Sequence, residues 1–318
     1  MWEKEIVTRI PLIIDCDPGV DDAVALLLAF ATPDVLDLIC VTTVAGNVDI
    51  GRTVRNARLI RQIAGRGDVP VHPGAVRPLR RPPADASQFH GDSGLGDFPL
   101  IEPALPADPM PAEDAIIKAV MARPQGAVRL AVTGPMTNLA LALRKAPQIA
   151  GRLGPVVAMG GARAEGGNIT ASAEYNIWAD PDAAAEVLAA GLDLALIGLD
   201  ATHQVRATTE RIARLKAIDT PSAHAAWAML DFCQRRQKEL VGWESPPLHD
   251  PCVIAFLLDP ALFETRPAHI RVETVSDLTR GHTQVEFRLS APSPANARWA
   301  TKADGQGLFD LLIDRLSR

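Results

Sequence analysis

Four aspartates crowd the segment IDCDPGVDD at residues 14–22, namely Asp15, Asp17, Asp21 and Asp22. Carboxylates this close repel one another and resist removal from water unless a cation or strong hydrogen-bond donors compensate them. Capping of a helix that begins here would account for one acid, not four. Oxygen ligands without a Cys or His pattern are typical of Ca²⁺ or Mg²⁺ rather than Zn²⁺. The segment therefore predicts a site for a hard divalent cation.

The elements that would position this cluster follow from the alternation of apolar and amphipathic segments. Short apolar segments, as expected of strands buried on both faces, cover residues 11–15, 36–43, 128–134, 155–161 and 192–199. Helical patterns lie between them, at 21–31, 52–64, 112–122, 136–146 and 181–190. This alternation predicts an α/β fold with an open, mostly parallel, doubly wound, Rossmann-like sheet. Ligands of such sheets bind where the loops after the strands converge, so the polar site residues are expected there.

The rest of the chain fits a single domain over residues 1–318, because no linker or repeat divides it. Residues 77–111 are rich in Pro and Gly, which predicts a flexible loop over the site. Residues 208–239 have a helical pattern, and a late strand within 284–292 is expected to precede a final helix at 307–316.

The composition excludes several classes of protein. A net charge of −6 and a pI near 5.7 give no basic surface for nucleic acid, so a small-molecule partner is expected. The four cysteines lack CxxC spacing, which favours buried thiols in a reducing compartment. No apolar stretch reads as a signal peptide or a membrane span. These features favour a cytoplasmic enzyme that contacts neither nucleic acid nor membrane.

The run DCDPGVDDA resembles the DxDxxxDD signature of the inosine-uridine-preferring nucleoside hydrolases. The likeness continues in matching order through TTVAGN at 42–47, HGDSGLGD at 90–97, VTGPMTNLA at 132–140, MGGARAEGGN at 159–168, AEYNIWADPDAA at 173–184 and LHDP at 248–251. The resemblance implies the nucleoside hydrolase fold and calcium-dependent hydrolysis of the N-glycosidic bond of ribonucleosides, which releases ribose and a free base. It also implies a role in purine or pyrimidine salvage and a homodimer or homotetramer.

The resemblance further implies the groups that hold Ca²⁺ and activate water. The ligands would be Asp17, Asp22, Asp250 and the backbone carbonyl of Thr133, with Asp15 supporting them from behind. Thr133 follows an apolar strand and Asp250 precedes an apolar helix, so both can face one crevice. Asp17 would take the proton from the attacking water, and Asn47 would orient that water.

The remaining assignments concern ribose and the leaving base. Asn168 and Glu174 are matched to the 5′-hydroxyl, Asn176 with Asp21 to the 2′- and 3′-hydroxyls, Met159 to the edge of the sugar, His249 to protonation of the base, and His90 to the loop over the site. A structural role stays open for His249, His90 and Met159, and Asp180 is interpreted as a helix cap. Trp227, Phe232 or Trp243 would stack on the base. Asp92 stands where the family usually has glutamate.

Two other functions compete with this interpretation. DCDPG after a strand is similar to the nucleophile loop of haloacid-dehalogenase-like, magnesium-dependent phosphatases, but that reading leaves Asp250, Glu174 and Asn176 without a role. A ribosyl-binding protein without catalytic activity is disfavoured because every implied catalytic position is filled.

Overall fold

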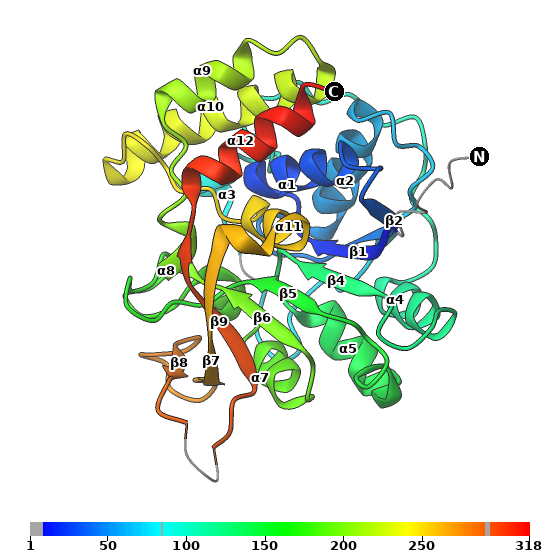
Figure 1. Cartoon of the computed structure of the whole chain (residues 1–318), viewed down its shortest axis with the longest axis vertical. Helices are drawn as coiled ribbons and strands as arrows, with labels where there is room; N and C mark the ends of the chain where they lie inside the picture. The colour runs from blue at the N-terminus through cyan, green and yellow to red at the C-terminus, as the bar shows by residue number, and fades with distance from the viewer. Residues whose placement is uncertain (1–8, 84, 290–292) are drawn as a thin grey trace, which may run out of the picture.

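The computed structural model describes residues 9–83, 85–289 and 293–318. Within these ranges nine strands form one sheet in the order β3-β2-β1-β4-β5-β6-β9-β7-β8 (Figure 1). Strands β1 to β6 and β9 pair in parallel, whereas β7 runs antiparallel to β9 and β8 antiparallel to β7. The strands are β1 (Ile10–Cys16), β2 (Leu36–Thr43), β3 (Val71–Pro73), β4 (Arg129–Val132), β5 (Val156–Met159), β6 (Leu194–Ile197), β7 (Phe263–Val272), β8 (Thr283–Glu286) and β9 (Ala297–Ala303). The predicted mostly parallel α/β sheet is confirmed.

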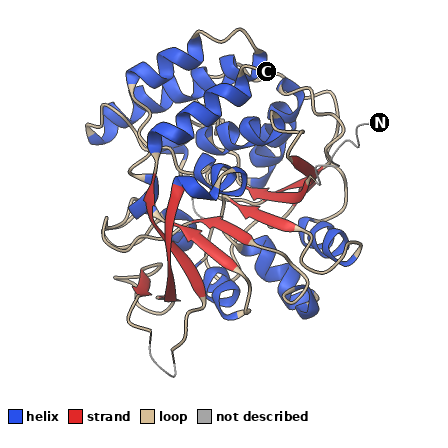
Figure 2. Ribbon diagram, viewed as in Figure 1, coloured by secondary structure: helices blue, strands red, loops and turns tan. Residues whose placement is uncertain are grey.

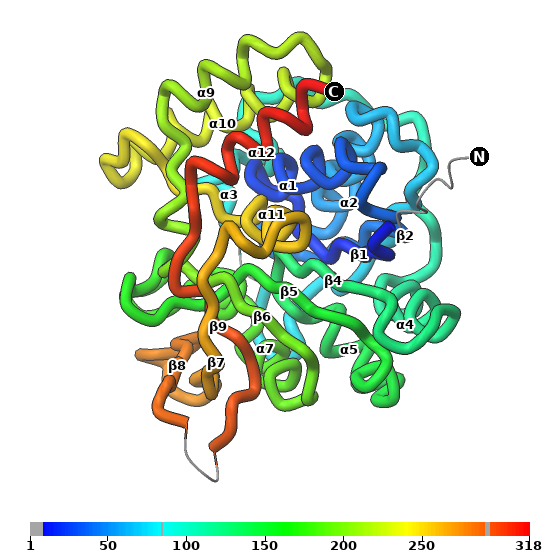
Figure 3. Tube along the Cα trace, in the orientation of Figure 1, coloured from blue at the N-terminus to red at the C-terminus, as the bar shows by residue number. Residues whose placement is uncertain are grey.

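Helices cover both faces of this sheet, as Figure 2 shows. The helices are α1 (Val20–Phe30), α2 (Ile50–Ile63), α3 (Ser87–His90), α4 (Ala112–Met121), α5 (Thr137–Lys145), α6 (Tyr175–Ala179), α7 (Pro181–Ala189), α8 (Leu199–Thr202), α9 (Thr209–Lys216), α10 (Pro221–Val241), α11 (Pro251–Leu258) and α12 (Gly305–Leu316), with 3₁₀ turns at Pro147–Ile149 and Pro260–Leu262. The trace in Figure 3 groups α1, α2 and α9 to α12 on one face and α4, α5 and α7 on the other. The sheet is therefore doubly wound.

Two apolar cores lie on the two faces of the sheet, and the central strands contribute side chains to both. Along β1, Leu12 and Ile14 belong to the core beneath α1, whereas Ile13 belongs to the opposite core. In β4, Leu130 and Ala131 divide in the same way. A strand that is buried on both faces must be apolar at successive positions, which is why these segments read as continuous apolar runs.

The C-terminal part of the sheet departs from the sequence prediction. Strands β3, β7 and β9 were not predicted. Strand β7 is only partly buried, and Glu264, Arg266 and Pro267 along it are exposed. The helical pattern over 208–239 is divided into α9 and α10 by Pro221, and the Thr220 hydroxyl accepts a hydrogen bond from the first turn of α10. The predicted strand within 284–292 ends at Glu286, and residues 290–292 lie outside the described ranges.

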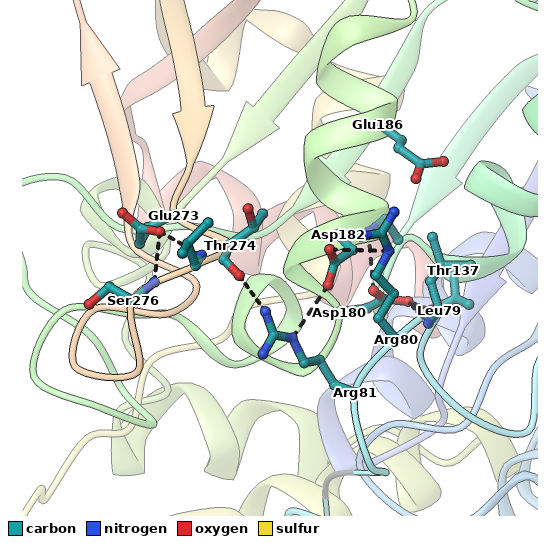
Figure 4. A network of polar contacts seen from close by, with 12 residues as sticks. Leu79, Arg80, Arg81, Thr137, Asp180, Asp182, Glu186, Glu273, Thr274 and Ser276 are labelled. Atoms are coloured by element: carbon teal, nitrogen blue, oxygen red, sulfur yellow. Dashed lines mark hydrogen bonds and ion pairs between the residues drawn. The ribbon is translucent and has the colours of Figure 1, made fainter.

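The segment 77–111 is anchored at both ends, although its described residues contain only the short helix α3. Figure 4 shows the first anchor, in which the Leu79 N–H donates to Asp180 Oδ2 over 2.9 Å and Arg81 contacts Asp182 and the Thr274 carbonyl. At the second anchor the Arg58 Nε–H donates to the Leu105 carbonyl over 2.8 Å. The flexibility expected between the two anchors stays a prediction.

Asp180 caps α7, as the sequence indicated, and also carries the first anchor. Its carboxylate accepts from Ala183 N–H at 3.1 Å, from Leu79 N–H at 2.9 Å and from the Thr137 hydroxyl at 2.7 Å. Asp180→Ala leaves these buried donors without an acceptor, so we expect the free energy of unfolding to fall by about 2–4 kcal/mol. Urea denaturation monitored by tryptophan fluorescence measures the change.

Asp182→Ala is the matched control, because Asp182 makes only longer ion pairs with Arg80 and Arg81, at 3.8 and 3.4 Å. Its loss should cost less than about 1 kcal/mol. Equal destabilisation by both substitutions would show that Asp180 is not the anchor of this segment.

Candidate active site

A cavity of about 370 Å³ lies at the carboxyl edge of the sheet, where the loops after β1, β2, β4, β5 and β6 converge. It collects residues that are far apart in the sequence, as expected for a doubly wound sheet. The predicted site residues that line it are Asp21, Asn47, His90, Thr133, Met159, Asn168, Glu174, Asn176, His249 and Asp250. Asp17 and Asp22 are fully buried and do not line the cavity.

Three carboxylates converge at one point of this site. Asp21, Asp22 and Asp250 each offer an oxygen, and these oxygens lie within 4.8 Å of one another. The Thr133 hydroxyl donates to Asp22 Oδ1 over 2.7 Å and the Asn47 side-chain amide donates to Asp22 Oδ2 over 3.1 Å. Asp22 and Asp250 are among the metal ligands expected from the sequence, and Asp21 lies beside them; the ligand role of Asp17 stays a prediction.

The Asp17 carboxylate lies in a backbone cradle, closely enclosed between Gly46 and Gly134. A Cβ atom added to Gly46 or Gly134 would overlap an Asp17 oxygen, so only glycine fits on both sides. The Asn47 N–H donates to Asp17 Oδ2 over 2.7 Å, whereas Oδ1 is buried without a donor among the described residues. Asp15 stands behind it, and its Oδ1 accepts from Thr42 and Asn138.

Burial makes the charged form of these acids unfavourable. It raises the pKa of Asp17 and Asp250 well above the ordinary value, and the neighbouring negative charges raise both further. The pKa values of Asp21 and Asp22 are raised for the same first reason, and that of Asp15 is raised to about 7. Among these described acids, Asp15 Oδ2 and Asp17 Oδ1 are buried without a hydrogen-bond partner. Such a group of buried carboxylates with raised pKa values fits a hard dication, whose positive charge would stabilise their ionised form.

Glu174 and Asn176 line the same cavity as Asp21 and Asp250. Glu174 caps α6, and its carboxylate accepts from the N–H groups of Asn176, Ile177 and Gly161 at 2.9 to 3.2 Å. Burial raises the pKa of Glu174 to about 6, although these hydrogen bonds lower it. The Asn176 side-chain amide donates to the Thr133 carbonyl over 2.7 Å. The carbonyl predicted to bind the metal is thereby joined to the segment that carries Glu174 and Asn176.

Tyr175, the only tyrosine of the chain, was not assigned a role from the sequence. Its hydroxyl donates to the Gly46 carbonyl over 2.6 Å, and its N–H donates to Asn168 Oδ1 over 2.9 Å. Gly46 is one of the two glycines around Asp17. Tyr175 therefore connects the segment that carries Asn168, Glu174 and Asn176 to the loop that shapes the Asp17 cradle.

Two histidines predicted from the sequence lie at this cavity. His249 Nδ1 is 2.8 Å from the Thr202 hydroxyl, and burial lowers its pKa to about 3. His90 Nδ1 accepts from the Val20 N–H at 3.2 Å and is 3.9 Å from Asp21, and burial lowers its pKa to about 4. Both rings are therefore neutral near pH 7 in this state.

Of the aromatic and polar side chains that line the cavity with His249, the sequence analysis predicted only some. Trp243 lines the cavity, whereas Trp227 packs near Lys216 and Phe232 against Gly96. Among the residues that the sequence analysis missed are His203 and Arg206. Both follow β6, so the rule that ligands bind after parallel strands could have found them.

This doubly wound sheet, with buried acids at its carboxyl edge, is the fold shared by the nucleoside hydrolases. The family model described as "Inosine-uridine preferring nucleoside hydrolase" matches residues 12–310, and the chain belongs to that family. It is similar to the pyrimidine-specific ribonucleoside hydrolase RihA of Shewanella sp. (strain ANA-3), with 41% identity over 308 residues that cover 96% of each chain.

Solved structures of the same class resemble the whole fold. A plant nucleoside hydrolase, the PpNRh1 enzyme, matches with a TM-score of 0.91 and 31% identity over 98% of this chain and 99% of that one. The purine-preferring ribonucleoside hydrolase from Gardnerella vaginalis matches with a TM-score of 0.90 and 32% identity, covering 96% and 98% of the two chains. The family membership decides against the phosphatase alternative. Among the described helices none is long and apolar enough to cross a membrane.

The raised pKa values predict how stability depends on pH when divalent ions are removed. Folding raises the pKa of Asp17, Asp22 and Asp250 above the unfolded value of about 4. Their contribution to stability is therefore complete below about pH 4 and is lost as pH rises through the folded values. With chelator present, we expect these groups to lower the urea midpoint progressively as pH rises above about 4, and Ca²⁺ to restore it most at the higher pH.

Asp22→Asn isolates this effect from the titration of surface groups. It should flatten the dependence on pH and weaken the response to Ca²⁺, whereas Asp219→Asn, at a fully exposed position, should change neither. If Asp22→Asn and the wild type show the same pH dependence, the cluster does not carry the predicted charge.

Proposed function

We propose that this enzyme is a calcium-dependent hydrolase of ribonucleosides that prefers pyrimidine bases. The observation that carries the proposal is the convergence of the Asp21, Asp22 and Asp250 carboxylates beside a cavity that Glu174 and Asn176 also line. The 41% identity to RihA, named as pyrimidine-specific, supports the base preference, since the purine-preferring structure is less similar at 32%.

The residues that would hold Ca²⁺ are Asp17, Asp22, Asp250 and the Thr133 carbonyl, with Asp21 close enough to join them. All supply oxygen, as Ca²⁺ requires. When bound, the ion offsets the carboxylate charge and acidifies water at the site. The Asn176 amide occupies only one lone pair of the Thr133 carbonyl, so the carbonyl retains a second one for a ligand.

The chain's own residues carry the proton transfers. Asp17 accepts a proton from the attacking water through its buried, unpaired Oδ1, and Asn47, which bonds to both Asp17 and Asp22, orients that water. The water oxygen bonds to C1′ through an oxocarbenium-like transition state. The C1′–N bond breaks and its electron pair passes to the base. Because His249 is neutral in the free enzyme, its ring first takes a proton from solvent and then gives that proton to the base. Asp17 returns its own proton to solvent, so the cycle balances.

Ribose is held by the hydrogen-bonding groups across the cavity. Asp21 and Asn176 would bind the 2′- and 3′-hydroxyls, and Asn168 and Glu174 the 5′-hydroxyl. Met159 would border the sugar, and His90, fixed by the Val20 N–H beside Asp21, would close the side next to α3. Buried groups left without a partner penalise a substrate that lacks a hydroxyl.

A nucleoside panel tests the proposed function. We expect free ribose from uridine and cytidine, less from inosine and adenosine, and at least about tenfold lower kcat/KM for 2′-deoxyuridine because Asp21 and Asn176 lose a partner. Chelator should abolish turnover and Ca²⁺ should restore it. A reducing-sugar assay measures the product.

Asp17→Asn should lower kcat by at least about 10²-fold because the proton acceptor is lost. The asparagine side chain has the same size and shape as aspartate and fills the same cradle, so the variant should still fold. Nucleoside binding without ribose release by the wild-type protein would instead favour a ribosyl-binding protein. Full activity in chelator would refute the calcium requirement.

The role of His249 is tested by the basicity of the leaving group. Since a nitrophenolate leaves without a proton, His249→Ala should leave hydrolysis of p-nitrophenyl riboside nearly unchanged, whereas uridine hydrolysis should fall by about 10²–10⁴-fold. Steady-state rates on the two substrates give the comparison. An equal loss on both would assign His249 to sugar positioning or to the fold.

A further inference from the structure

The cavity is lined by side chains of both charge signs. Asp21 and Asp250 supply carboxylates, and the cationic side chain of Arg206 lines the same cavity beside Trp243. Arg206 lies close enough to His249 for its charge to contribute to the lowered pKa of that ring. Arg206 follows β6 and α8 and takes no part in the steps derived above. A charged side chain in a ligand cavity loses hydration, so its retention there calls for a function.

Arg206 is fixed rather than free to swing. Its guanidinium carbon lies 4.7 Å from the centre of the Trp243 ring, and its Nη1–H donates to the Ser245 carbonyl over 3.3 Å. Its backbone carbonyl accepts from Arg211 over 2.6 Å, and its backbone forms a bridge with Pro247. Stacking on tryptophan and a hydrogen bond to a carbonyl preorganise the planar guanidinium.

The neighbouring carboxylate does not cancel this charge. Glu165 Oε2 is 3.0 Å from His203 Nδ1, so it already has a partner, and 44% of its side chain is exposed to screening solvent. Burial lowers the pKa of Arg206 and the charge of Glu165 raises it, but a guanidinium stays protonated at neutral pH. His249, which lines the same cavity, is uncharged there. Arg206 therefore supplies a fixed positive charge close to His249.

We propose that Arg206 stabilises the negative charge that develops on the departing nucleobase. The inference rests on the proposed function, in which heterolysis leaves positive charge on the ribosyl group and an electron pair on the base. The carboxylates stabilise the first charge and Arg206 the second. Fixed charges placed where charge develops lower the barrier without reorganising. Arg206 keeps its own protons and forms no covalent bond.

The test measures rates over substrates whose leaving groups become less basic, namely uridine, 5-fluorouridine and p-nitrophenyl riboside. For Arg206→Gln we expect about a 10²-fold loss of kcat/KM with uridine, mostly in kcat, a smaller loss with 5-fluorouridine and the smallest with the nitrophenyl substrate. The rate should therefore depend more steeply on leaving-group basicity. Arg206→Lys keeps the charge and should recover part of the uridine rate.

Arg214→Gln is the control, because Arg214 pairs with Asp310 on the surface, and it should match the wild type on every substrate. An equal loss by Arg206→Gln over the series, or no loss, would overturn the proposal, because loosening of the Trp243 segment slows all substrates alike. Within one variant, the ratio of the rates on different substrates does not depend on the fraction of enzyme that is folded. Partial unfolding therefore does not change how steeply the rate depends on leaving-group basicity. A wild-type protein inactive on all three substrates would instead refute the proposed function.

Discussion

The site depends on keeping the carboxylates of Asp17, Asp21, Asp22 and Asp250 close together where water is largely excluded. Asp17 and Asp22 are fully buried, and burial raises the pKa of both, so the site has to supply counter-charge or donors. The beginning of α1 provides part of this, because the Gly19 N–H donates to Asp22 Oδ2 over 3.0 Å and the helix dipole favours negative charge. Asn47 and Thr133 provide further donors from the loops after β2 and β4.

The wall of the cavity that carries Glu174 and Asn176 is held by the hydrogen bonds that begin helix α6. Glu174 satisfies the first N–H groups of α6, and those bonds fix the direction of its carboxylate and of the Asn176 side chain. Tyr175, between them, reaches the Gly46 carbonyl and so ties this helix to the Asp17 cradle. A change in one wall of the cavity is therefore transmitted to the other through a few buried bonds.

The sequence predicted best the elements that are buried on both sides. Strands β1, β2, β4, β5 and β6 are continuous apolar runs because successive residues enter opposite cores. Strand β7 was missed because Glu264 faces solvent and Pro267 interrupts the pattern, and β3 was missed because it has only three residues. The break between α9 and α10 at Pro221 is local, so closer attention to that proline could have found it.

From the sequence alone came the fold class, the family and the prediction that Asp15–Asp22 form a cation site, since spacing along one segment carries that information. The resemblance had already grouped Asp250 with Asp22, but only the tertiary structure showed that Asp21 lies within 4.8 Å of both, because Asp250 reaches them only when the intervening strands are ordered in the sheet. The tertiary structure also placed the Tyr175 hydroxyl on Gly46 and Arg206 on Trp243. These contacts join residues far apart in the chain, and no local spacing encodes the path of the connections that bring them together.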